Sequence, residues 1–358
     1  MKLTTIIGAR PQFIKAAVVS RAFREHSPNV NEVLIHTGQH FDATMSRVFF
    51  DELDLPVADY SLCIGGGTHG QNTGRMIEAI EAVLLKEKPD WVLVYGDTDS
   101  TIAGALAAAK LQIPIAHVEA GLRSFNRCMP EEINRVLTDH LSKVLFTPTE
   151  TADRNLASEG IQGASVQRVG DVMYDAMLYY SAHAAERSLI KIFNREPKSY
   201  VLATIHRAES TDNPALLTAI LDGLGASRLP VVWPIHPRTR KRLAGFKLNL
   251  PRNFYLLDPV GYVDMLVLEK NAALIATDSG GVQKEAYLLG VPCITLRNET
   301  EWVETVKAGC NRLVGASEAE IRDALRNSPD LCSPNTDLFG DGQAGIAISR
   351  AFELLSNG

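Results

Sequence analysis

The sequence predicts an α/β protein built from two doubly wound domains, and two observations support this prediction. Apolar runs rich in Val, Ile and Leu alternate with helical patterns along the chain. Continuous apolar strands separated by helices are typical of parallel sheets that are covered on both faces. In addition, 358 residues, of which 46% are hydrophobic, are enough to bury one core in each of two domains.

The N-terminal half holds the first series of strands and helices. Its expected strands are LTTII (3–7), EVLIH (32–36), WVLVY (91–95), PIAHVE (114–119) and VLFTP (144–148). The glycine-rich segment 63–75 is predicted to be a loop, with a helix opening at Arg75.

A second series begins after a polar and Ala-rich helical stretch that runs from about residue 170 to 199. Its expected strands are YVLATIH (200–206), VVWPI (231–235), FYLLD (254–258), ALIAT (273–277) and PCITL (292–296). We place the boundary at Gly170, which gives an N-terminal domain of residues 1–169 and a C-terminal domain of residues 170–344. A last helix within 345–358 can pack on either half. Two such domains facing each other would form a central cleft, a common place for a ligand.

Composition excludes several classes of function. The net charge of -6 and the absence of a basic run argue against nucleic acid as a partner. No apolar run reaches the roughly 18 residues that span a bilayer, and the N-terminus leads directly into a strand, so we expect a cytoplasmic protein without a membrane partner. The five cysteines are scattered without C-x-x-C spacing, so we expect reduced thiols and neither a disulfide framework nor a zinc site.

Two segments have the character of phosphate sites at the start of helices. In GARPQFIK (8–15), Arg10 and Lys15 supply positive charge near a helix N-terminus; an ordinary turn with two solvated cations is the alternative. In TDSGGVQKEA (277–286), Ser279, Gly280 and Gly281 can cradle a diphosphate between a strand and a helix. Glu285, one turn further on, can accept hydrogen bonds from ribose hydroxyls; a structural Gly-Gly turn is the alternative.

Three carboxylates follow strand ends or open helices in the N-terminal half. Asp97 ends one strand, where the alternative role is the N-cap of the next helix. Glu119 ends the apolar strand PIAHVE and has no capping role. Glu131 opens a helix, where a carboxylate is favourable to the helix dipole regardless of function. If the three converge, their repulsion raises at least one pKa toward neutrality and provides an acid and a base.

Cations follow the strands of the C-terminal half. His206 and Arg207 come at the end of the first strand, where they can meet a leaving phosphate. His236 and Arg238, in HPRTR, follow the next strand. Metal binding by His117, Glu119 and Asp97 is an alternative use of the N-terminal residues, but no supporting pattern surrounds them, so no metal is expected.

Eight ordered motifs together resemble the non-hydrolysing UDP-N-acetylglucosamine 2-epimerase family over residues 3 to about 350. They are GARPQFIK, TGQH, YGDTDST, HVEAGLRS, PEEINR, TIHRAES, TDSGGVQKEA and FGDGQA. The resemblance implies two Rossmann-like domains of the glycosyltransferase-B type, a C-terminal helix that crosses back to the first domain, a homodimer and no cofactor. It also implies a reaction, in which UDP is eliminated to form a glycal and is then added back after the C2 proton has been exchanged on the opposite face.

The resemblance further implies roles for the residues singled out above. Asp97, Glu119 and Glu131 would be the acid/base group, and His206 would assist departure of UDP. The nucleotide would be held by Arg10, Lys15, Ser279, Gly280 and Glu285.

Two departures from the family bear on the sugar. Trp302 stands where the family commonly has an Arg in a T-E-R-P-E segment, and the loop RSFNRCMPEE (123–132) is short and brings Arg127 close to Glu131. Both features resemble the subgroup that acts on UDP-2,3-diacetamido-2,3-dideoxy-glucuronate in O-antigen synthesis, and we expect Arg123 or Arg127 to pair with the sugar carboxylate. UDP-N-acetylglucosamine is the alternative substrate; a glycosyltransferase and a non-catalytic nucleotide-sugar sensor are the rival functions.

Overall fold

The chain forms two compact units in the computed structural model, which describes residues 1–39, 52–184, 196–329 and 338–356. Unit 1 contains Met1–Leu178 and Thr336–Gly358, and unit 2 contains Tyr179–Asn335. The division therefore lies within helix α7 (Val172–Ala184) rather than at Gly170. The N–H of Asp171 donates to the carbonyl oxygen of Phe339 at 2.9 Å, which ties this part of the chain to the returning segment of unit 1.

Unit 1 is built on a seven-stranded sheet whose neighbouring strands all pair in parallel, in the order β3-β2-β1-β4-β5-β6-β7. The strands are β1 (Lys2–Ile7), β2 (Asn31–His36), β3 (Tyr60–Ser61), β4 (Trp91–Tyr95), β5 (Ile115–Val118), β6 (Val144–Thr147) and β7 (Val166–Arg168). The remaining helices of this unit are α1 (Arg10–His26), α3 (His69–Glu87), α4 (Asp99–Lys110), α5 (Pro130–Leu141), α6 (Glu150–Ser158) and α16 (Ala344–Ser356). The expected α/β class with parallel sheets is confirmed.

The order of strands reverses between β1 and β4, because the chain first moves outward to β2 and β3 and then returns. Ligands of open α/β sheets bind beyond the carboxyl ends of strands at such a switch point. Gln12 joins the two strand ends here: its Oε1 accepts from Gly8 N at 2.8 Å, and its Nε2 donates to the carbonyl of Tyr95 at 2.9 Å. The segments GARPQFIK and YGDTDST therefore meet.

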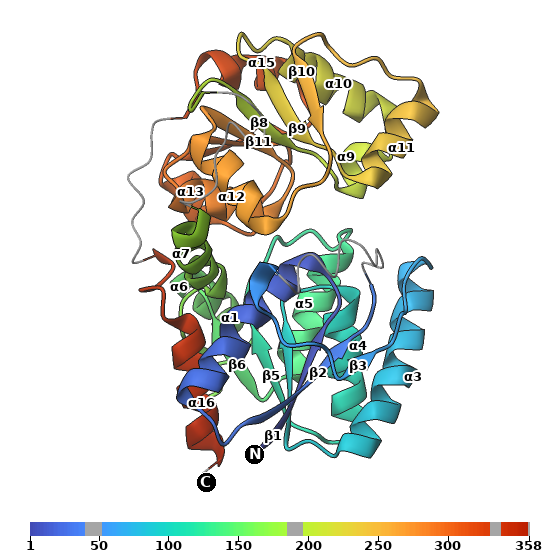
Figure 1. Ribbon diagram of the computed structural model, residues 1–358, viewed down its shortest axis with the longest axis vertical. Helices are drawn as coiled ribbons and strands as arrows, with labels where there is room; N and C mark the ends of the chain where they lie inside the picture. The colour runs from blue at the N-terminus through green and yellow to red at the C-terminus, as the bar shows by residue number, and fades with distance from the viewer. Residues whose placement is uncertain (40–51, 185–195, 330–337, 357–358) are drawn as a thin grey trace. The chain divides into compact units, whose positions relative to one another are not determined.

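Helix α16 completes the core of unit 1. Figure 1 shows it, in red, alongside α1, in blue. The buried ring of Phe352 meets the rings of Phe23, Trp91 and Phe146 at centroid distances of 5.6, 5.9 and 6.1 Å. The C-terminal helix thus packs on the domain formed by the first half of the chain.

Unit 2 has a six-stranded sheet in the order β10-β9-β8-β11-β12-β13, again with parallel neighbours, and its order reverses between β8 and β11. The strands are β8 (Val201–Thr204), β9 (Val231–Pro234), β10 (Phe254–Leu257), β11 (Leu274–Thr277), β12 (Cys293–Thr295) and β13 (Asn311–Leu313). The helices are α9 (Ala208–Thr211), α10 (Pro214–Gly225), α11 (Pro237–Phe246), α12 (Tyr262–Asn271), α13 (Gly280–Leu288), α14 (Val303–Lys307) and α15 (Glu318–Arg326). The segment TIHRAES follows β8 and TDSGG follows β11, so both lie at the switch point.

Two expectations are corrected by the structure. Helix α3 begins at His69 rather than at Arg75, because the Thr68 side chain accepts a hydrogen bond from Gln71 N and caps the helix. Cys310 is disulfide-bonded, so not all cysteines are reduced thiols; spacing along the chain does not reveal which sulfurs come within bonding distance. Cys332, and His40 of the TGQH motif, lie outside the described residues. No helix in the described parts of the chain has the length and apolar character needed to cross a membrane.

Candidate active site

The acids of unit 1 stand on unusual backbone at the ends of β4 and β5. Gly96, which precedes Asp97, has φ +60°, and Glu119 itself has φ +69°, a conformation that costs a residue with a side chain on the order of 1–3 kcal/mol. The N–H groups of Glu119 and Ala120 both donate to the carbonyl oxygen of Phe146, each at 3.1 Å. The strand end is therefore bent where the carboxylate is presented, and such strain is concentrated at functional sites.

Glu119 is paired with Lys15. The two side chains are only 8% and 9% exposed and form an ion pair across the switch point. A Cβ atom at Gly96 would lie 3.1 Å from Lys15 Nζ and 3.2 Å from Glu119 Oε2, so the pair rests against the turn that carries Asp97. We expected Lys15 to hold an anion of the ligand. Its charge is instead engaged by Glu119, because the strand order places the end of β5 near the first turns of α1.

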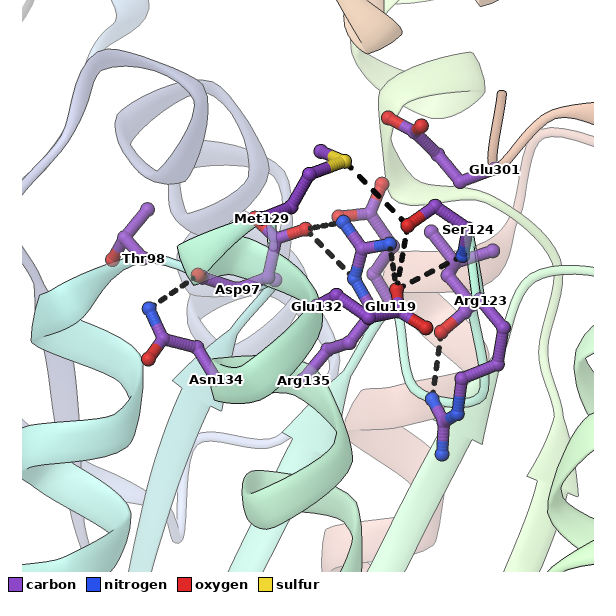
Figure 2. A network of polar contacts seen from close by, with 12 residues as sticks. Asp97, Thr98, Glu119, Arg123, Ser124, Met129, Glu132, Asn134, Arg135 and Glu301 are labelled. Carbon is purple, nitrogen blue, oxygen red and sulfur yellow. Dashed lines mark hydrogen bonds and ion pairs between the residues drawn. The ribbon is translucent and has the colours of Figure 1, made fainter. Parts of the chain in front are cut away.

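Asp97 has its own cation, Arg135 of α5. The Arg135 Nε donates to Asp97 Oδ2 at 3.1 Å and Nη2 donates to the same oxygen, while Nη1 donates to Glu132 Oε2 at 2.8 Å (Figure 2). Arg135 is buried, whereas 29% of the Asp97 side chain is exposed. The carboxylate is thus accessible while its partner is fixed. The expected repulsion between the carboxylates is reduced here, because Asp97 and Glu119 each have a counter-ion.

Asp97 is not the N-cap of α4. That role belongs to Thr98, whose side chain accepts a hydrogen bond from Thr101 N. Asn134 of α5 also donates to the Asp97 carbonyl oxygen at 3.0 Å (Figure 2). Backbone and side chain of Asp97 are therefore both held by α5, and the capping alternative is excluded.

Glu131 and Glu132, the two glutamates at the start of α5, differ in burial and in role. Glu132 is buried, and its carboxylate accepts from Ser124 N, Ser124 Oγ and Phe125 N, each at 2.9 Å. Glu131 is only partly buried. Glu132 is thus the residue that shapes the preceding loop, and Glu131 keeps the accessibility that its expected acid/base role requires.

The loop before α5 separates its two arginines. Arg123 is buried; its Nη1 donates to Asp139 Oδ2 at 2.7 Å, and its Nε and Nη2 donate to Glu159, both at 2.7 Å. The expectation that Arg123 pairs with a sugar carboxylate does not fit this geometry, because internal carboxylates already occupy its guanidinium. Arg127 is exposed, in a tight turn closed by the hydrogen bond from Met129 N to the carbonyl oxygen of Asn126 at 3.0 Å.

The metal alternative for His117 does not fit the structure. Its Nδ1 lies 2.7 Å from Asp139 Oδ1 and its Nε2 lies 2.7 Å from the Gly96 carbonyl oxygen, so neither ring nitrogen can bind an ion. The described residues also contain no group of three His, Cys, Asp or Glu side chains suited to a metal.

In unit 2, Asp278 organises the switch point between β8 and β11. It is fully buried, and its Oδ2 accepts from His206 N at 3.0 Å and from Arg207 N at 2.9 Å. The His206 ring approaches Asp278 Oδ1 with Nδ1 at 3.2 Å and leaves 46% of its side chain exposed. His206 is thus oriented by a buried carboxylate and accessible to a ligand, as a group that meets a phosphate must be.

The expected nucleotide segment begins α13. Ser279 caps this helix by accepting from Val282 N, and Glu285 is buried one turn later. A Cβ atom at Gly280 would lie only 2.2 Å from Glu301 Oε1, so the Glu301 side chain would have to move to make room for it. A Cβ atom at Gly281 would meet Ser279 Oγ only at 3.9 Å. The N-terminus of α13 therefore presents backbone N–H groups, the arrangement that binds phosphates.

Trp302 points into the interior rather than replacing an arginine at a surface. It is 2% exposed, and Lys284 Nζ lies 4.0 Å from its ring centroid, a cation–π contact. The neighbouring Glu301 accepts from Arg297 Nη1 at 2.9 Å and lies 3.8 Å from Arg207 Nη2. Lys284 of α13 thus lies against Trp302, the residue that stands where the family commonly has its arginine.

The remaining predicted residues lie at helix starts. His236 caps α11 by accepting from Arg238 N at 3.2 Å, and the guanidinium of Arg238 already pairs with Asp212 at 2.6 Å. Arg10 is the first residue of α1 and is partly exposed. Their expected contact with a nucleotide stays a prediction.

Four buried residues that hold the others in place are not among the predicted site residues: Glu132, Arg135, Asp139 and Asp278. Glu132 and Arg135 belong to the PEEINR motif, whose charged residues at helical spacing were a usable signal. Asp139 and Asp278 act on partners distant in the sequence, and nothing local marks them.

Known proteins similar to this chain agree on one family. Residues 21–353 match the model of the family described as UDP-N-acetylglucosamine 2-epimerase. A UDP-N-acetylglucosamine 2-epimerase homolog from Methanococcus maripaludis is 54% identical, and the alignment covers 100% of both chains. The UDP-2,3-diacetamido-2,3-dideoxy-D-glucuronate 2-epimerase of Pseudomonas aeruginosa is 52% identical and is covered over 98% of this chain and 99% of its own.

A solved structure of this family has the same fold. The crystal structure of Methanocaldococcus jannaschii UDP-GlcNAc 2-epimerase in complex with UDP-GlcNAc and UDP matches with a TM-score of 0.92 and 46% identity, covering 99% of this chain and 100% of that one. The expected glycosyltransferase-B type fold is thereby confirmed. The chain therefore belongs to the UDP-N-acetylglucosamine 2-epimerase family and is an isomerase, a UDP-sugar 2-epimerase.

Proposed function

We propose that this enzyme inverts C2 of UDP-2,3-diacetamido-2,3-dideoxy-glucuronate to give the mannuronate epimer. The observation that carries the choice of sugar is the exposed position of Arg127 in the turn before α5, with Arg123 engaged inside the protein. A guanidinium presented in this way suits a carboxylate, which it can bind through two hydrogen bonds. The 52% identity to a relative named for this substrate supports the same choice.

The chemistry explains why paired acids are needed. A base takes the proton from C2 while the C1–O bond to UDP breaks, which leaves a double bond between C1 and C2. UDP then adds back to C1 as an acid delivers a proton to the other face of C2. No carbonyl group acidifies the C2 proton, so the developing charge on the diphosphate must be stabilised at the same time.

We assign the acid/base work to Asp97, Glu119 and Glu131. Asp97 and Glu119 are held by Arg135 and Lys15, and both lie at the ends of adjacent strands. The exposed ring of His206 would stabilise the departing UDP. Within the same proposal the nucleotide contacts Arg10, Arg207, His236, Arg238, Ser279, Gly280, Gly281 and Glu285.

The compartment and the oligomeric state of the enzyme belong to the same proposal. We propose a cytoplasmic homodimer that needs no cofactor and supplies O-antigen or a related polysaccharide. Ile133 and Leu137, 42% and 46% exposed, lie one turn apart on α5 and offer an apolar contact for a second copy. Sedimentation of the purified protein at micromolar concentration tests the dimer.

Proton NMR in deuterium oxide tests the reaction. The protein is incubated separately with UDP-2,3-diacetamido-glucuronate and with UDP-N-acetylglucosamine. We expect the epimer with deuterium at C2 from the first substrate only. Turnover of the second substrate alone would assign the enzyme to UDP-N-acetylglucosamine, and no exchange with either would favour a transferase or a sensor.

Arg127→Gln tests the recognition of the carboxylate. A hydrogen-bonded charge pair contributes about 1.5–3 kcal/mol, so kcat/KM for the acidic sugar should fall by roughly 10–150-fold. Arg127→Lys keeps a charge but loses the two-pronged geometry and should give an intermediate loss. Arg154→Gln removes another exposed arginine of unit 1 and should change nothing. Equal kinetics of Arg127→Gln and Arg154→Gln would remove Arg127 from the substrate site.

A further inference from the structure

His117 has two hydrogen-bond partners that can only accept. Its ring is fully buried in β5, with the carbonyl oxygen of Gly96 at 2.7 Å from Nε2 and Asp139 Oδ1 at 2.7 Å from Nδ1. Burial by itself would raise the pKa of Asp139, but the hydrogen bonds and charges of His117 and Arg123 outweigh it and hold that pKa below its ordinary value. Asp139 is therefore a carboxylate, and the geometry places an acceptor against each ring nitrogen of His117.

The other carboxylate oxygen of Asp139, Oδ2, contacts the turn that follows β5. It accepts from Gly121 N at 3.1 Å and from Arg123 Nη1 at 2.7 Å. Gly121 has φ +80° and follows Glu119 by two residues, and a Cβ atom there would lie 2.6 Å from the carbonyl oxygen of Ala152. The carboxylate therefore fixes a turn that only glycine can make.

Together His117 and Asp139 join the two turns that present the acids. His117 contacts the Gly96 carbonyl oxygen, directly before Asp97, and Asp139 accepts from the Gly121 amide, two residues after the strained Glu119. Arg123 completes the cluster by pairing with both Asp139 and Glu159. A buried group of this kind is favourable only when every member has a partner, which is the case here.

We propose that His117 and Asp139 are a pair of positioning residues that fixes Asp97 and Glu119 relative to each other for proton transfer at C2. The proposal rests on the acid/base roles assigned to these two residues above. Neither His117 nor Asp139 needs to touch the substrate. Their contribution is to hold two strand ends, and misplacing a catalytic group by about 1 Å can cost on the order of 100-fold in rate.

The first test uses the wild-type enzyme labelled with ¹⁵N in its histidines. Because an acceptor lies 2.7 Å from each ring nitrogen of His117, one histidine should show N–H signals at both ring nitrogens, and these protons should exchange slowly with water because the ring is fully buried. If no histidine of the folded, active enzyme shows both N–H signals, the double hydrogen bond does not exist and the proposal is overturned.

The second test restores the ring from solution. In His117→Gly we expect kcat for C2 exchange to fall roughly 100-fold with little change in KM. Added 4-methylimidazole, which can donate from both nitrogens, should recover activity. The isomer 1-methylimidazole has the same size but only one nitrogen that can carry hydrogen, and it should not. Rescue by both isomers, or an unchanged kcat, would refute a role that depends on two hydrogen bonds.

A matched variant separates positioning from a general loss of packing. His36→Gly removes a partly buried ring from β2 of the same sheet, where it packs against Phe13 at 5.2 Å. It should lose stability but keep its kcat and should not respond to either isomer. Because the wild-type enzyme is assayed alongside, absence of C2 exchange in the wild type would refute the proposed function instead, while the ¹⁵N measurement still decides the state of His117.

Discussion

Arg135→Met removes the cation that fixes Asp97 and leaves a side chain of similar length. It breaks the hydrogen bonds of Arg135 to Asp97 Oδ2 and the 2.8 Å hydrogen bond to Glu132. The two carboxylates are affected differently, because Glu132 is buried while 29% of the Asp97 side chain is in contact with solvent. The stability cost therefore arises mainly at Glu132, and the catalytic cost at Asp97.

The expected loss of stability in Arg135→Met follows from the surroundings of Glu132 and Asp97. Breaking a buried ion pair by removing one partner costs about 3–5 kcal/mol. Glu132 keeps three hydrogen bonds from Ser124 and Phe125, so we expect the lower end, about 3 kcal/mol. For a domain of this size each kcal/mol lowers Tm by roughly 2–4 °C, which gives a decrease of about 6–12 °C. Loss of the fixed Asp97 should lower kcat on the order of 100-fold.

The assay combines thermal unfolding with C2 deuterium exchange. Arg154→Met is the control, because it breaks an exposed pair with Glu150 that should contribute less than about 1 kcal/mol. We expect its Tm and turnover to match the wild type. If Arg135→Met melts within 2 °C of Arg154→Met and turns over equally fast, the reasoning about the Asp97 and Glu132 network is refuted.

Two further substitutions test other parts of the chain. Burial raises the pKa of Asp175 from 3.8 to about 6, although Gly345 N donates to it at 2.8 Å. Its stabilising contribution is complete below about pH 4 and is lost as pH rises through about 6, a difference of roughly 3 kcal/mol; Asp175→Asn should raise Tm more at pH 8 than at pH 4.5, and equal effects at both pH values would contradict this. Gly280→Ala places a Cβ atom 2.2 Å from Glu301 Oε1 and should weaken UDP binding by roughly 10–100-fold in calorimetry. Gly245→Ala, which meets nothing within 4 Å, should bind UDP as the wild type does; equal affinity of the two variants would contradict a crowded Gly280.

The long strands could be predicted because apolar runs of four or more residues mark them. The three strands that were missed, β3, β7 and β13, are two or three residues long and partly exposed, so they have no apolar run. They pair because a neighbouring strand offers its edge, which is a property of the sheet rather than of the segment. The start of α3 was missed because three glycines obscured the cap at Thr68.

The site was predictable where one residue has one task at a strand end, as with Glu119. It was not predictable where the partner comes from another element. Lys15 is predicted to contact the ligand but pairs with Glu119, and Arg123 is predicted to contact the sugar but pairs with Asp139 and Glu159. A charge in the sequence indicates that a counter-ion is needed, and only the fold decides whether the protein or the ligand provides it.

The packing of α16 on unit 1 also determines the order in which the two units can be completed during synthesis. Unit 2 is one continuous segment, Tyr179–Asn335, inserted into unit 1. Phe352, which packs against the rings of Phe23, Trp91 and Phe146, is synthesised after every residue of unit 2. Unit 1 therefore begins before unit 2 but is completed after it. A chain that stops after unit 2 lacks the part of the unit 1 core that Phe352 fills.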